Sequence, residues 1–242
     1  MYPHRIRLRG PWQSEPLARA VPHADGRIEM VERELPPPGR MLMPCRWADG
    51  GLADFAGRVR FRRRFGLPRL LDPHELVWLT FAGVDGTAVA TLTGRFLGQH
   101  EQGPEPFEFE ITGALLERNE LVVDVEATAG NGGLWGEVAL EIRCTAFLHG
   151  VRVWREVAEA PAKLHIQGVV VGTSDRPLEL YIVLDRSTIA YRTLQPTAAG
   201  EFFDIVHEES MPAAGRSKGQ EVRVDLVNGA VIWYTVVCQA PP

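Results

Sequence analysis

The stretch "LTFAGVDGTAVATLTG", residues 79–94, decides the fold that we expect for this chain. Apolar and polar residues alternate in its first part and again in "AVATL", as in strands that bury one face in a core. Gly83, Asp85 and Gly86 separate the two parts, because glycine tolerates positive φ and aspartate hydrogen-bonds its own backbone. The stretch therefore predicts two short strands joined by a turn.

The same period-two alternation recurs along the first 145 residues. Helical spacing of apolar residues is almost absent, and only "TGALLERN" (112–119) reads as a short helical turn. The 24 glycines and 18 prolines punctuate short segments, which is typical of a β-sandwich. The predicted strands lie at 5–9, 58–65, 75–81, 88–94, 106–112, 120–127 and 137–143.

The segment "RVRFRRRF" (58–65) is the one basic cluster of the sequence. Alternation puts Val59, Phe61 and Phe65 on one face of a strand and directs Arg63 inward with them. Two interpretations stay open: an anion or glycan site, or a solvated strand face with one arginine paired to a carboxylate at the sandwich edge. The second is favoured because an isolated charge run usually marks a solvated face. The outward arginines are Arg58, Arg60, Arg62 and Arg64.

The rhythm of short strands restarts near residue 162 and continues to residue 239. About seven strands fit in this interval, the number found in an immunoglobulin-like sandwich. The "NG" at 228–229, between "VRVDLV" and "AVIWYTVV", predicts a hairpin. We therefore expect a boundary between 150 and 160 and two domains, at 1–150 and 160–242.

Seven motifs in order over the first domain resemble the N-terminal sugar-binding domain of glycoside hydrolase family 2, the β-galactosidase and β-glucuronidase family. They are "LRGPWQ", "FRRRF", "LTFAGVDGTAVATLTG", "LGQHEQG", "PFEFEIT", "NELVVDV" and "GGLWGEVALE". The resemblance implies an all-β chain, with a galactose-binding-like jelly-roll sandwich followed by an immunoglobulin-like β-sandwich. Two positions depart from the family pattern: Thr93 replaces an asparagine and Glu110 an aspartate.

The same resemblance implies that this chain is not an enzyme. Catalysis in the family belongs to a (β/α)₈ barrel with two glutamates, and a barrel takes about 250 residues. The 242 residues are already occupied by two sandwiches. Asn119 and Glu120 in "RNEL" have the same residue types as the family's catalytic Asn-Glu pair. Because they precede a strand, we interpret them as a turn residue and a strand-edge residue.

Five residues are the candidates for contact with a ligand at one end of the jelly roll: Trp135, His100, Glu101, Trp47 and Asp49. A tryptophan ring suits the C–H face of a sugar, although many tryptophans pack against their own domain instead. No cofactor is expected, except that Asp49 and Asp54 would suit a structural calcium ion. Ordinary loop aspartates are the competing interpretation of that pair.

Charge and cysteine content restrict the partners. A net charge of −5 argues against nucleic acid, and no apolar run is long enough to cross a bilayer. The three cysteines lie far apart without a CxxC motif, and no leader precedes the first strand. These features favour the cytoplasm.

Three functions are consistent with the residues. The leading hypothesis is a non-catalytic carbohydrate-binding or accessory protein that resembles the sugar-binding half of a family 2 glycosidase. The alternative is a structural module that assembles with itself or with a separate catalytic chain. A small hydrolase with an unrecognised site is the third, although no nucleophile elbow or zinc motif supports it.

Overall fold

The computed structural model describes residues 3–101, 103, 105–128, 132–156, 162–209 and 219–241. It divides into two compact units. The jelly-roll unit comprises Arg5–Asp72 and Leu76–Glu141, and the immunoglobulin-like unit comprises Met1–His4, Pro73–Glu75 and Ile142–Pro242. The units thus divide at residues 141 and 142, and the domain limits 1–150 and 160–242 stay a prediction.

The described residues are all-β, as expected. Their one helical element is the 3₁₀-helix η1 (Thr112–Ala114), inside the segment for which the sequence predicts a helical turn. No helix in the described ranges is long or apolar enough to cross a bilayer.

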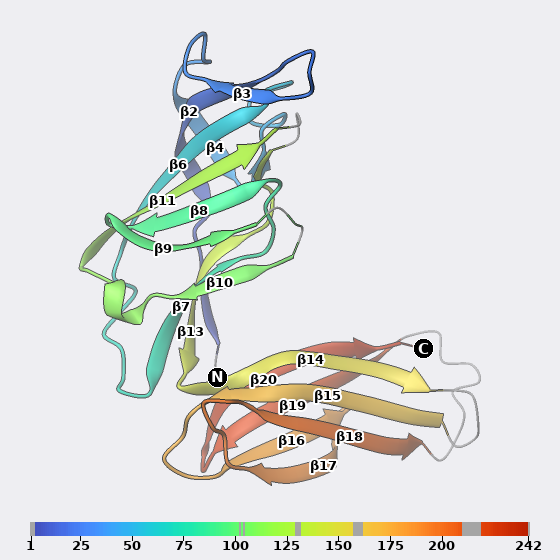
Figure 1. Cartoon of the computed structure of the whole chain (residues 1–242). Coiled ribbons are helices and arrows are strands. Elements are labelled where there is room, and N and C mark those ends of the chain that lie inside the picture. The colour runs from blue at the N-terminus through green and yellow to red at the C-terminus, as the bar shows by residue number, and fades with distance from the viewer. Residues whose placement is uncertain are drawn as a thin grey trace. The chain divides into compact units, whose positions relative to one another are not determined.

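The largest sheet of the jelly-roll unit has the strand order β3-β2-β6-β11-β8-β9, with β4 paired to β2 (Figure 1). Its pairings are antiparallel. The strands are β2 (Gly10–Pro22), β3 (Ile28–Val31), β4 (Gly39–Met43), β6 (Gly57–Gly66), β8 (Thr87–Leu92), β9 (Arg95–His100) and β11 (Arg118–Ala127).

A second sheet of the jelly-roll fold has the order β1-β13-β7-β10, and a short pair joins β5 to β12. β7 and β10 pair antiparallel, with Phe81 opposite Phe107. These strands are β1 (His4–Arg7), β5 (Cys45–Arg46), β7 (Glu75–Phe81), β10 (Phe107–Glu110), β12 (Gly133–Leu134) and β13 (Val138–Cys144).

The core of the jelly-roll unit follows from alternation along the strands. In the β6–β11 ladder, Phe61 lies opposite Val123 and Arg63 lies opposite Leu121. Opposed residues of an antiparallel pair share one face. Phe61, Val123 and Leu121 are fully buried. The predicted inward face of "RVRFRRRF", including the inward Arg63, is confirmed.

Two turns of the jelly-roll unit place Gly86 and Thr93 at positive φ. Gly86 has φ +113, and a Cβ there would lie 2.3 Å from the carbonyl oxygen of Glu126. Thr93 also adopts a positive φ, of 48°, in the turn between β8 and β9. An asparagine fits that conformation more easily than threonine does. The backbone N–H of Glu120 donates to Thr93 Oγ1 at 3.2 Å and ties the turn to β11.

The immunoglobulin-like unit has two sheets, β14-β15-β18 and β17-β16-β19-β20 (Figure 1). The predicted hairpin at "NG" is confirmed, since β19 ends at Asn228, β20 begins at Val231 and Gly229 has φ +60. The strands are β14 (Ala146–Glu156), β15 (Ala162–Gly172), β16 (Leu178–Leu184), β17 (Ser187–Leu194), β18 (Glu201–Glu209), β19 (Gln220–Asn228) and β20 (Val231–Ala240).

Candidate functional site

Trp135 follows β12 and is half-buried. The Arg46 guanidinium lies over its ring, 5.3 Å from the centroid. A Cβ at Gly83 would lie 2.4 Å from the ring, so only glycine leaves room for the tryptophan. Gly83 therefore serves close packing against Trp135 rather than the turn for which the sequence suggested it.

Three segments meet around this ring. β5 and β12 pair so that Arg46 lies opposite Gly133. Asp85 and Gly133 exchange backbone hydrogen bonds of 2.9 and 3.3 Å. The Asp85 carboxylate also accepts from Arg46 Nε at 3.0 Å. An aromatic ring, a guanidinium and a carboxylate are thus held together by main-chain pairing.

The Trp135 Nε1–H is buried and has no hydrogen-bond partner among the described residues. Its polar end is therefore not offered to a ligand, and only part of the ring surface is exposed. What the cluster offers is a partial apolar face beside a donor, Arg46, and an acceptor, Asp85.

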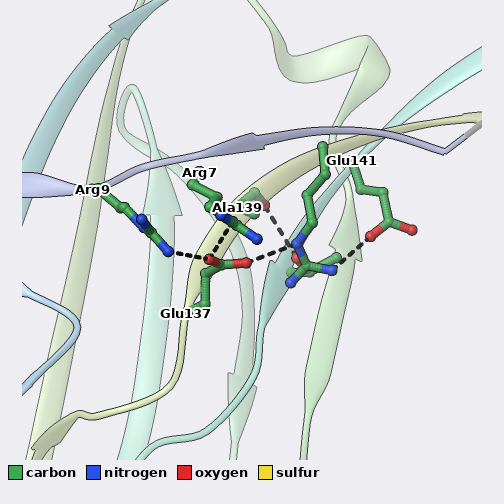
Figure 2. Close-up of polar contacts among 7 residues, drawn as sticks. Arg7, Arg9, Glu137, Ala139 and Glu141 are labelled. Carbon is green, nitrogen blue, oxygen red and sulfur yellow. Dashed lines mark hydrogen bonds and ion pairs between the residues drawn. The ribbon is translucent and has the colours of Figure 1, made fainter.

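Glu137, two residues after Trp135, is surrounded by arginines (Figure 2). Its carboxylate accepts from Arg5 Nε at 2.9 Å, pairs with Arg7 Nε at 2.6 Å and lies 3.6 Å from Arg9. Arg5 also donates to the buried Glu141 at 3.1 Å. These ion pairs fix the start of β13, and hence the end of the Trp135 segment, to β1.

Trp47 lies in the core, where it cannot contact a sugar as the sequence suggested. It is fully buried, with its ring edge-on to Phe55 at 5.6 Å between centroids. A Cβ at Gly132 would lie 2.4 Å from the same ring. The sequence suggested a platform for a sugar, but packing leaves this ring no exposed face.

Asp49 and Asp54 are exposed. Among the described residues, neither belongs to a group of three or more side chains that could ligate a metal ion. Burial raises the pKa of the Cys45 thiol, and the charge of Asp49 raises it further. The structure adds no support for calcium at this pair, which stays a prediction.

His100 is the last residue of β9. Its ring stacks on Phe107 with centroids 4.1 Å apart, and Phe107 stacks on Phe81 at 4.5 Å. Glu101 is exposed and accepts from Gln99 at 2.8 Å. One face of the His100 ring is thus engaged by its own domain. No contact among the described residues joins His100 or Glu101 to Trp135, and their role in ligand contact stays a prediction.

The basic segment is neutralised within its own sheet. Each outward arginine pairs with a carboxylate: Arg58 with Glu126 at 2.6 Å, Arg60 with Asp124 at 2.7 Å, Arg62 with Glu15 at 2.5 Å, and Arg64 with Glu120 at 2.9 Å. The hydrogen bond to Asp124 raises the pKa of Arg60 still further. These pairings support the solvated-face interpretation over an anion site.

The inward arginine differs from expectation. Arg63 donates to the carbonyl oxygen of Pro11 at 3.2 Å rather than to a carboxylate.

Asn119 is buried, and its amide hydrogen-bonds both the N–H and the C=O of Leu116. Asn119 is therefore a structural turn residue, and the sequence interpretation of "RNEL" agrees with this geometry.

Sequence reasoning gave no role to a hollow of about 660 Å³ in the immunoglobulin-like unit. Residues 173–176 of the segment "VGTSDRP" (171–177) form part of its wall, although the sequence suggested only a turn there. Its remaining residues come from distant segments, so the sequence carried no signal for it.

No protein-family model and no curated protein matches this chain. Solved structures do match, across nearly its whole length. Bifidobacterium dentium β-glucuronidase, complexed with coumarin-3-O-glucuronide, has 19% identity and a TM-score of 0.72 over 98% of this chain and 47% of the enzyme. Bacteroides uniformis β-glucuronidase has 18% identity and a TM-score of 0.74, with 98% and 32% covered. Ruminococcus gnavus β-glucuronidase has 15% identity and a TM-score of 0.68, with 98% and 44% covered.

This chain spans less than half the length of each of these enzymes. The described residues form twenty strands and no α-helix, so they include no (β/α)₈ barrel. The chain therefore has the fold of the N-terminal, non-catalytic part of the family 2 glycosidases, a jelly roll followed by an immunoglobulin-like sandwich.

Proposed function

We propose that this chain is a non-catalytic accessory module that associates with a glycosidase barrel. The observation that carries the proposal is the match of 98% of the chain to glycosidases of which it spans 32 to 47%. Nearly every residue of this chain is matched, but less than half of each enzyme is. Such coverage suits a chain that is one non-catalytic part of a larger assembly. Fold alone does not determine function, so the assembly needs a direct test.

A second candidate is a carbohydrate contact at the Trp135 cluster. The specific observation is the half-buried ring with Arg46 and Asp85 joined beside it by a 3.0 Å ion pair. Arginine donates and aspartate accepts, so a sugar hydroxyl would find both partners next to an apolar surface.

The accessory role is tested by producing the chain together with a separate glycosidase (β/α)₈ barrel. We expect the 242-residue chain alone to leave nitrophenyl glycosides and esters unhydrolysed, and the complex with the barrel to exceed 26.9 kDa in light scattering. Turnover by the pure chain, or no association with that barrel, would contradict the proposal.

The carbohydrate contact is tested by calorimetric titration with galactosides, glucuronides and xylosides. Trp135→Ala is expected to remove the binding that occurs at this cluster and so to lower the number of sugars bound per chain, whereas Trp154→Ala in the other unit serves as a control. If none of the ligands binds at millimolar concentration, or if Trp135→Ala binds as the parent does, the contact is wrong.

A further inference from the structure

The hollow of about 660 Å³ lies wholly in the immunoglobulin-like unit, at the ends of several strands. Such a volume is typical of small-molecule sites. Its wall combines the segment 173–176, the β19–β20 hairpin residues Asn228, Val231 and Trp233, and the pair Pro73 and His74 with Thr145.

Main-chain hydrogen bonds fix the wall. The N–H of Thr145 donates to the carbonyl of His74 at 2.8 Å, and the N–H of Thr173 donates to the carbonyl of Thr145 at 3.0 Å. Gly172 has φ +96, and a Cβ there would lie 1.9 Å from the Thr145 oxygen. Only glycine permits this approach, so the segment that carries the polar residues 173–176 is held in one place.

A buried amide orients one side of the hollow. Asn228 is 6% exposed, and its Oδ1 accepts from Arg176 Nε. A guanidinium only donates, so the amide oxygen must face Arg176 and the amide NH₂ remains a donor. Arg176 keeps further N–H groups beyond the one used, and Ser174 Oγ accepts from the Arg176 backbone at 3.5 Å.

An aromatic surface forms another side. Trp233 is 7% exposed and stacks in parallel with His74, with ring centroids 5.9 Å apart and planes 8° from parallel. Both rings line the hollow. A ligand with one apolar face can therefore contact the small exposed part of this ring pair while its polar groups reach the opposite wall.

The polar lining is balanced in charge and mixed in hydrogen-bonding character. Asp175 and Arg176 carry opposite charges, so the pair favours neither an anion nor a cation. Hydroxyls of Thr145, Thr173 and Ser174 both donate and accept, and the Asp175 carboxylate only accepts. No described residue forms a hydrogen bond or ion pair with that carboxylate.

We propose that this hollow binds a neutral polyhydroxylated ring, namely one saccharide unit. A neutral ring needs no charge compensation, its hydroxyls match a lining that holds both donors and acceptors, and its C–H face suits the exposed part of the Trp233–His74 ring pair. The site lies in the other sandwich from Trp135 and requires neither a barrel nor the Trp135 contact.

The proposal is tested on the full chain with glucose, galactose and xylose, and with glucuronate as the anionic comparison. Binding is followed by ¹H–¹⁵N spectra, in which the Trp233 indole and residues 173–176 are expected to shift with at least one neutral sugar. Asp175→Asn should weaken that binding about tenfold, because a hydrogen bond to a charged acceptor is lost. Val231→Trp, at an exposed rim position, should weaken it by narrowing the hollow.

Asp204→Asn, at an exposed position of β18 outside the hollow, is the matched control and should bind as the parent does. Thermal unfolding of each variant separates loss of the site from loss of the fold. The proposal is overturned if none of the three neutral sugars shifts these signals at about 50 mM, roughly fifty times a millimolar dissociation constant. It is equally overturned if Asp175→Asn and Val231→Trp leave binding unchanged, or if the shifts map to the Trp135 cluster alone.

Discussion

Two arginine-bearing strands of the jelly-roll unit handle their charges differently. In β6, each outward arginine has its own carboxylate, and three of the four pairs join residues directly opposite in the β6–β11 ladder. At β1 and the residues after it, Arg5, Arg7 and Arg9 converge on the single carboxylate of Glu137.

The position of each strand in its sheet explains the difference. β6 is a central strand between β2 and β11, so a neighbour about 4.8 Å away on each side offers a partner at every register position. β1 is an edge strand with β13 as its one neighbour. Side chains 5, 7 and 9 share a face by alternation, and all three share the Glu137 carboxylate, with Glu141 as a second acceptor for Arg5, because the edge supplies few acceptors. The arginines of β6 are therefore neutralised by separate carboxylates, whereas Arg5, Arg7 and Arg9 share the single carboxylate of Glu137.

The sharpest way to break this comparison is Glu137→Gln. Glutamine removes the charge and turns one oxygen that accepts from arginine into a donor, which leaves three guanidinium groups near each other without a shared anion. We expect a loss of about 2 kcal/mol in the free energy of unfolding, as several charge-assisted hydrogen bonds are lost together. Urea unfolding followed by tryptophan fluorescence measures it.

Glu32→Gln, at an exposed position, is the control for that variant and should unfold as the parent does. A loss below about 0.5 kcal/mol for Glu137→Gln would mean that the convergent cluster is no stronger than an ordinary surface pair.

A smaller effect is expected from Asp124→Asn in β11. Asp124 accepts two hydrogen bonds of 2.7 Å from Arg60, and the two side chains are 23% and 34% exposed. Bidentate geometry at a partly buried position should make the loss about 1 kcal/mol, and 1 M salt should reduce it.

Glu120→Gln is the matched comparison, since its partner Arg64 is 83% exposed in a pair of the same ladder. Its loss should stay under about 0.5 kcal/mol. Equal losses for Asp124→Asn and Glu120→Gln would show that burial and geometry do not rank these pairs.

The smallest effect is expected from Arg63→Met, which tests the inward arginine of the same strand. Arg63 Nε is buried and has no hydrogen-bond partner among the described residues, while one terminal nitrogen donates to Pro11. Methionine gives up that bond but also removes a buried unsatisfied donor. We expect a change within about 0.5 kcal/mol in thermal or urea unfolding. A loss above 2 kcal/mol would reveal a partner for Arg63 beyond those described here.

The candidate site could be anticipated only in part. The sequence identified Trp135 as a tryptophan on a glycine-rich segment, and the ring is half-buried as such a position allows. It did not reveal that Arg46 lies over the ring or that Gly83 packs against it, because those residues are 89 and 52 positions away. From the sequence, Trp47 was a candidate for sugar contact, as Trp135 was. Packing against Phe55 and Gly132 nevertheless buries the Trp47 side chain completely.

Local alternation predicted strands that overlap β1, β6, β7, β8, β10, β11 and β13, and also the inward direction of Arg63, because side-chain direction in a strand follows from its period of two. The "NG" turn predicted the β19–β20 hairpin. Neither signal predicted β2, β3, β4, β5, β9, β12 or β14. The order of the motifs was sufficient for the jelly roll, and the number of short strands after residue 162 indicated the immunoglobulin-like fold. Tertiary structure alone decided which carboxylate each arginine meets, which tryptophan keeps an exposed face, and that residues 73–74, 145, 173–176, 228, 231 and 233 line one hollow. Those outcomes depend on register and packing between segments far apart in the chain, and no local pattern encodes such distances.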